Sequence, residues 1–136
     1  MKLATASAVT TLYLADLAWA ADYKMTLIET GKRDYYCTVT LQIENTSEEA
    51  LADLNGHLIS LVDADDVGRS KGGSFLNVTP GATASAEFET PNAPCDQITG
   101  YRFLVGACRV GTSFMDQGDC AERIETETPI TEAVAR

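Results

Sequence analysis

The chain has 136 residues, of which 45% are hydrophobic, and it carries 20 acidic residues against 10 Lys and Arg, for a formal net charge of −10. This length suits one domain with one core and is short for two domains of ordinary size. Nucleic acids and anionic membrane surfaces attract clustered basic residues, and the longest basic run here is Lys32-Arg33. We therefore expect a single acidic domain whose partner is a protein and not a nucleic acid.

The first 20 residues are typical of an export signal. Lys2 gives a positive start, an apolar stretch of mostly small residues follows from Leu3 to Ala21, and Ala18-Trp19-Ala20 fits an A-x-A cleavage site. Asp16 interrupts the apolar stretch, and a charge there disfavours insertion into a membrane. The alternative is an uncleaved helix over residues 1–20, in which case the protein would contact a membrane. Cleavage predicts a periplasmic or secreted protein.

The expected domain covers residues 21–125 and consists of strands. Residues of Arg33–Glu44 alternate in polarity, so Tyr35, Cys37, Val39, Leu41 and Ile43 are predicted to face the core. Other strands are expected over Tyr23–Glu29, Leu58–Val62, Arg69–Val78, Ala82–Glu89 and Ile98–Cys108, the last with Tyr101, Phe103 and Val105 in the core. About seven short strands separated by turns predict an all-β, antiparallel, immunoglobulin-like β-sandwich.

Three segments fit the strand pattern less well. Ser47–Leu54 and Gln117–Ile124 contain helix formers and would each form at most a short helix between strands. Residues 126–136 lack apolar periodicity and contain Pro129. We expect these last residues to form a flexible C-terminal tail.

All four cysteines, Cys37, Cys95, Cys108 and Cys120, follow the predicted cleavage site. An even number of cysteines in an exported chain of this size predicts two disulfide bonds. If strand direction alternates, the strands that follow Cys37 and Cys95 start at the same end of the sandwich. This favours Cys37–Cys95 with Cys108–Cys120, and the competing pairing joins Cys37 to Cys108. No short C-x-x-C spacing suggests zinc or redox chemistry.

A resemblance to a known family lies between Cys37 and Phe88. The matching pieces are Val39–Asn45, Ile59–Asp63, the turn Pro80-Gly81, and Phe88. Together they resemble the small immunoglobulin-like domains of bacterial envelope proteins, in particular the FxLYD type, although Ile59 and Val62 replace the aromatic residues of that motif. The resemblance implies an immunoglobulin-like fold and leaves the function open.

Two groups of residues invite a catalytic or metal-binding interpretation. Asp63, Asp65, Asp66 and Gly68 resemble the start of a calcium loop, but the later ligand positions hold residues unable to complete it, and a solvated hairpin turn explains them better. His57, Ser60 and Asp63 share one strand, and Ser60 points to the face opposite the other two. We expect no catalytic residue, no cofactor and no metal site.

The leading functional hypothesis is a non-enzymatic protein-interaction module in the periplasm or outside the cell. The predicted contact surface is a loop end formed by Asn92–Gln97 and Gly111–Gly118, in which Phe114 and Met115 are apolar residues among polar ones. The alternative for this pair is a small core under a disulfide bond. The alternative functions are an accessory subunit held to a membrane complex by a retained N-terminal helix and, less favoured, a small hydrolase or metal-dependent enzyme. For Arg102, Arg109 and Arg123 we favour pairing of each with a neighbouring carboxylate over a small basic patch.

Overall fold

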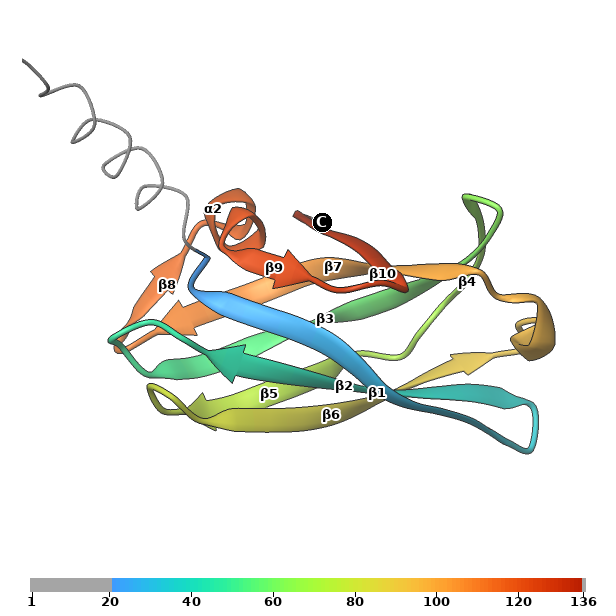
Figure 1. Cartoon of the computed structure of the whole chain (residues 1–136), viewed down its shortest axis with the longest axis horizontal. Helices are drawn as coiled ribbons and strands as arrows, with labels where there is room; N and C mark the ends of the chain where they lie inside the picture. The colour runs from blue at the N-terminus through green and yellow to red at the C-terminus, as the bar shows by residue number, and fades with distance from the viewer. Residues whose placement is uncertain (1–20, 136) are drawn as a thin grey trace, which may run out of the picture.

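Two β-sheets pack face to face in this protein, which we describe from a computed structural model covering residues 21–135 (Figure 1). The predictions made for residues 1–20 lie outside the described residues. Among residues 21–135, no helix has the length and apolar character needed to cross a membrane. The predicted all-β sandwich is confirmed, with strands longer than the sequence pattern indicated.

The first sheet has the strand order β6-β2-β1-β9. These strands are β1 (Tyr23–Arg33), β2 (Tyr36–Asn45), β6 (Thr83–Pro91) and β9 (Ile124–Thr126). β1 and β2 form a long antiparallel hairpin with a register shift between Leu27 and Glu29, where β1 contains one extra residue. β9 is short and runs parallel to β1, pairing only with Tyr23–Met25.

The second sheet has the order β10-β7-β3-β4, with β5 also on β3 and β8 also on β7. Its strands are β3 (Leu51–Val62), β4 (Asp65–Arg69), β5 (Gly73–Val78), β7 (Gly100–Val110), β8 (Ser113–Met115) and β10 (Ile130–Ala135). Two short helices complete the fold, the 3₁₀ turn η1 (Cys95–Gln97) and α2 (Gln117–Glu122). β7 crosses the whole length of the molecule, so η1 and α2 lie near its opposite ends (Figure 1).

Aromatic and aliphatic side chains from both sheets fill the space between them. Phe103 of β7 packs against Phe75 and Phe88, with ring centroids 6.5 and 5.9 Å away. Val39, Leu41 and Ile43 of β2 are fully buried, as the alternation predicted. The predicted core residues Tyr101, Phe103 and Val105 are also buried.

Several details differ from the sequence-based expectations. Tyr35 is 59% exposed because it lies in the β1–β2 turn and not in the regular part of the strand. The stretch Ser47–Leu54 is a turn followed by the start of β3, and Asn45 holds this turn by donating to the Glu49 and Val78 carbonyls, both at 2.8 Å. The stretch Arg69–Val78 is split between β4 and β5. The predicted short helix over Gln117–Ile124 is confirmed as α2.

The expectation of a flexible tail over residues 126–136 is wrong for 130–135. These residues form β10, which runs parallel to β7 from the Ile130–Tyr101 pair onward. Ile130 is 2% exposed and anchors this strand in the core. A single apolar residue produces no periodic pattern, so the sequence did not predict the strand. The sandwich therefore contains two parallel strand pairs, β1–β9 and β7–β10, and is not wholly antiparallel.

Candidate functional site

The two predicted contact loops lie at opposite ends of the sandwich. Asn92–Gln97 precedes the start of β7, and Gly111–Gly118 follows its end, so the full length of this strand separates them. The expectation of one loop cluster is therefore wrong. We describe each end separately, because the molecule offers two different surfaces.

Phe114 is the most exposed large hydrophobic residue of residues 21–135, at 75%. The turn between β7 and β8 uses Gly111 with a φ of 59°, which favours glycine, and sets the pairs Cys108–Met115 and Arg109–Phe114. Cys108 faces the core, so Met115 faces inward and is partly buried against the core. Phe114, one residue away, must face solvent. The predicted pair thus divides, with Phe114 at the surface and Met115 in the core.

Phe114 belongs to a row of four side chains that crosses the outer face of the second sheet. Register pairs Phe114 with Arg109, Arg109 with Asp53, and Asp53 with Leu76. Directly paired residues share a face, and neighbouring strands are about 4.8 Å apart, so the row spans roughly 14 Å. Leu76 is 58% exposed. We call Phe114, Arg109, Asp53 and Leu76 the Phe114 row.

The middle of the Phe114 row contains an unsatisfied acceptor. The Asp53 Oδ1 atom is buried and has no hydrogen-bond partner among the described residues. Buried polar atoms usually have such a partner, and leaving one without it is unfavourable. The row therefore exposes apolar groups at both ends, while this carboxylate oxygen in the middle is covered by neighbouring protein atoms.

Two hollows border the Phe114 end, with volumes of about 330 and 260 Å³. Both are lined by Glu49, Val110, Met115 and Arg123, and the larger one is also lined by Phe114. Arg123 forms an ion pair with Asp22 at 2.9 Å. The chain therefore enters the domain beside these hollows.

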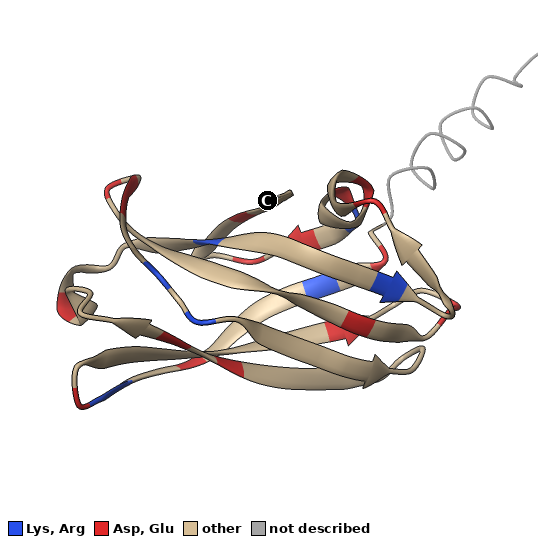
Figure 2. Ribbon diagram, turned by 180° about the vertical axis from the view of Figure 1, so that it is seen from behind, with Lys and Arg blue, Asp and Glu red and all other residues tan. Residues whose placement is uncertain are grey.

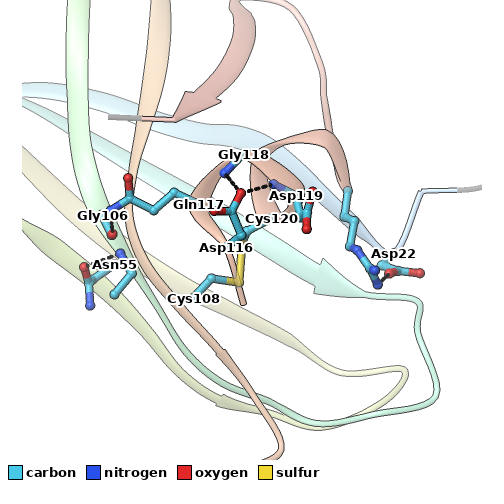
Figure 3. The surroundings of a disulfide bond; sticks show 11 residues. Asp22, Asn55, Gly106, Cys108, Asp116, Gln117, Gly118, Asp119 and Cys120 are labelled. Atoms are coloured by element: carbon cyan, nitrogen blue, oxygen red, sulfur yellow. Dashed lines mark hydrogen bonds and ion pairs between the residues drawn. A yellow bond between two sulfur atoms is a disulfide. The ribbon is translucent and has the colours of Figure 1, made fainter. Parts of the chain in front are cut away.

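Helix α2 and the Cys108–Cys120 disulfide bond lie at this end of the molecule (Figure 3). Cys108 and Cys120 are bonded, and both are fully buried. Asp116 caps α2 by accepting from the backbone amides of Gly118 and Asp119, at 3.0 and 3.2 Å. The side-chain amide of Gln117 donates a hydrogen bond to the Gly106 carbonyl of β7. These contacts hold the segment after β8 against β7 and so position Phe114.

The opposite end is closed by the Cys37–Cys95 disulfide bond. Both preferred pairings are thus confirmed, and no free cysteine occurs among residues 21–135. A pocket of about 400 Å³ lies beside this bond, between β1 and the start of β7. Its lining includes Leu27, Thr30, Ile98 and Tyr101. No sequence pattern indicated this pocket, because its walls come from segments far apart in the chain.

A second feature of this end is an aromatic pair at the tip of the β1–β2 hairpin. The Tyr35 and Tyr36 rings lie 4.5 Å apart, and the Lys71 ammonium group lies 4.5 Å from the centre of the Tyr36 ring. The Tyr35 and Tyr36 hydroxyl groups share a hydrogen bond, and this bond, followed by the contact with Lys71, lowers the pKa of Tyr36 because both favour its ionised form. The cluster is exposed and contains no residue from the pocket lining.

Two of the three arginines considered for a basic patch pair with carboxylates, which was the favoured alternative. Arg102 forms an ion pair with Glu132 at 2.9 Å, and Arg123 pairs with Asp22. Arg109 stands in the Phe114 row. Basic positions are spread along the ribbon with acidic ones between them, as Figure 2 shows.

The residues considered for catalysis or metal binding occupy ordinary structural positions. The His57 Nδ1 atom lies 3.0 Å from the Ser70 carbonyl oxygen, and Ser60 is buried. Asp63 and Ala64 form the tight β3–β4 turn, with φ angles of 50° and 74°, as expected for a hairpin turn. Within residues 21–135, no three His, Cys, Asp or Glu side chains gather in a way that could hold a metal ion.

Comparisons with known proteins address the fold. No family model matches the chain, so the FxLYD-type resemblance is not confirmed. No curated protein sequence matches it either. Among solved structures, the chain is similar to IrmA from Escherichia coli, with a TM-score of 0.60 and 8% sequence identity, over 79% of this chain and 92% of that chain. At this identity the likeness shows a shared β-rich fold and nothing about activity.

Proposed function

We propose that this protein is an exported, non-enzymatic interaction module that binds another protein of the cell envelope or extracellular space through the Phe114 row. The exposure of Phe114, at 75%, is the observation that carries the proposal. Covering Phe114 and the exposed Leu76 at the other end of the row with a partner would remove apolar surface from water, which favours binding. Aromatic residues and arginine dominate the binding free energy of protein interfaces, and the row contains both.

The row also indicates what the partner surface must supply. Phe114 and Leu76 need apolar contacts roughly 14 Å apart, as estimated from strand spacing. The hollow beside Phe114 could accept one apolar side chain, with Glu49 and Arg123 at its edge. Such a surface fits a folded protein better than a small ligand.

The proposed location rests on the cysteines. Disulfide bonds form and persist in oxidising compartments, and all four cysteines of residues 21–135 are paired. The bacterial structural neighbour is compatible with an extracytoplasmic protein. Export to the periplasm or beyond also agrees with the signal-like sequence before Ala21.

A membrane-anchored accessory subunit is the second candidate. Asp22 lines the smaller hollow and pairs with Arg123, so the chain joins the domain next to the Phe114 end. If residues 1–20 stay attached and lie in a membrane, this end would face the membrane surface. A partner bound at Phe114 would then be a membrane protein.

Site-specific photo-crosslinking tests the proposal. The photoreactive residue benzoylphenylalanine would replace Phe114 in one variant and Ser85, which is exposed on β6, in a control. Both would be expressed in the native host and irradiated. We expect one discrete crosslinked protein from position 114 and none from position 85. An excess of unlabelled protein should suppress this product, whereas an excess of the Phe114→Ala, Leu76→Ala variant should not. Equal products from both positions, or none from position 114, would contradict the proposal.

A further inference from the structure

β1 has an open edge at the end of the molecule opposite Phe114. β2 pairs with β1 along its length, but on the other side β9 pairs only with Tyr23–Met25. β9 then leaves the first sheet, and its last contact there is the Glu127 amide donating to the Met25 carbonyl at 3.1 Å. Within residues 21–135, no strand pairs with this side of β1 between Leu27 and Arg33.

Alternate residues along this edge point their backbone amide and carbonyl groups to the open side. The Asn45 backbone amide donates to the Ala82 carbonyl, and the Tyr35 carbonyl accepts from the Asn92 amide. The backbone groups of odd-numbered residues of β2 therefore point away from β1, and those of even-numbered residues point toward it. Thr40 and Thr38 pair with Glu29 and Gly31. The backbone groups of Glu29 and Gly31 therefore face β2. Those of Thr30 and Lys32 face the open side, because the extra residue near Leu27 shifts the alternation.

A pocket runs beside the same edge. Its volume is about 400 Å³, and it is lined by Leu27, Thr30 and Lys32 of β1 and by Asp96, Ile98 and Tyr101 near the start of β7. Apart from Lys32 and Asp96, whose charges are opposite, these residues are apolar or carry hydroxyl groups. The space is therefore suited to uncharged side chains that project from a strand lying along β1.

We propose that the open edge of β1 binds an extended segment of a different protein, which adds to the first sheet as a strand in line with β9. The segment would form backbone hydrogen bonds with Thr30 and Lys32 and place small apolar side chains in the pocket. An unpaired edge is otherwise a liability, since it exposes donors and acceptors to any passing strand. This site is separate from the Phe114 row and does not depend on it.

The chain itself and a second copy are poorer occupants. The residues after β9 cross to the second sheet and form β10, so they are already used. Two copies would each bring a formal net charge of −10, and such molecules repel one another. A second β1 would also bring its own Lys32 against the pocket that already contains Lys32. An uncharged segment of another protein avoids both costs.

Nuclear magnetic resonance with a defined peptide tests the inference. The probe is the capped peptide Lys-Thr-Val-Thr-Val-Thr-Val-Lys, titrated into the isotope-labelled protein purified after export. We expect saturable shifts of the Thr30 and Lys32 amide signals and hydrogen exchange slowed by roughly tenfold or more at both. The same peptide N-methylated at alternate amides keeps its side chains but loses backbone donors, so it should bind at least about tenfold more weakly.

Two proline variants give a matched comparison. Thr30→Pro removes an amide that faces the open edge, whereas Ser85→Pro removes the corresponding outward amide on the far edge of the sheet, because Ser85 pairs with the even-numbered Gln42. Thr30→Pro should abolish peptide binding, and Ser85→Pro should leave it unchanged. Equal binding of the N-methylated peptide, shifts at β6 in place of β1, or no saturable shift would overturn the inference. Protection of Thr30 that rises with protein concentration without peptide would assign the edge to a second copy instead.

Discussion

The two ends of the sandwich offer partners different chemical groups. The β8 end presents side chains, because a short hairpin fixes Phe114 outward while Met115 packs inward. The opposite end presents backbone, because β9 leaves β1 after Met25 and uncovers the following residues. The two proposed sites would give one fold two modes of recognition, one dependent on side-chain identity and the other on strand geometry.

A disulfide bond closes each of these ends. Cys37–Cys95 joins β2 to the segment before β7, across 58 residues of sequence, and Cys108–Cys120 joins β7 to α2 across 12. The first bond restrains distant parts of the chain, whereas the second holds one local segment. Removing one bond at a time should therefore perturb one end of the sandwich and leave the other end intact.

The largest effect is expected from removing the long-range bond. In the chain-entropy model, a loop of this length contributes about 4 kcal/mol to the free energy of unfolding. A variant with Cys37→Ala and Cys95→Ala should lose about that much stability in urea-induced unfolding. It should also lose binding of the peptide probe, since both cysteines line the pocket. A loss below about 1 kcal/mol would show that the unfolded chain is not restrained as the model assumes.

The local bond should contribute somewhat less to stability. Cys108→Ala with Cys120→Ala opens a short loop, for which the same model gives about 3 kcal/mol. The peptide-binding edge should keep its affinity in this variant, while crosslinking from position 114 should fall. If peptide binding falls as well, the two ends are coupled, which would contradict the independence of the two proposed sites.

A small effect on stability is expected at Phe114 itself. Phe114→Ala should change the free energy of unfolding by about 0.5 kcal/mol or less, because surface substitutions rarely do more. Phe103→Ala is the matched control, since Phe103 is fully buried and such a change costs about 3–5 kcal/mol. A destabilisation by Phe114→Ala close to that of the control would mean that Phe114 is a core residue in solution.

The smallest effect concerns acid sensitivity near the open edge. The hydrogen bond from Arg33 lowers the pKa of Glu89, so the folded state favours the ionised carboxylate. This contribution is present above the pKa of Glu89 in the unfolded chain and is lost as the pH falls through the lower pKa of the folded state. Glu89→Gln should therefore reduce the fall in melting temperature on acidification. The same fall in the variant and the original protein would refute this assignment.

Local patterns in the sequence predicted the parts of the fold that depend on them. Alternation identified β2 and β7, and strand direction gave the disulfide pairing that the structure confirms. β9 and β10 were missed because each is short and is stabilised by a parallel neighbour distant in sequence. The sequence predicted Phe114 as a surface residue because an apolar residue in a polar turn is unusual. It did not predict the pocket beside β1, because that pocket depends on which strands end early. No local pattern reports that property.

The proposed function requires an exported domain that is closed at both ends by disulfide bonds. The decisive measurement is intact and non-reduced peptide mass spectrometry of the protein purified from its native host. We predict a mature chain starting near Ala21, with peptides linked through Cys37–Cys95 and Cys108–Cys120. A chain that keeps Met1 would favour the membrane-anchored subunit, and four free thiols would contradict export and with it the proposed function.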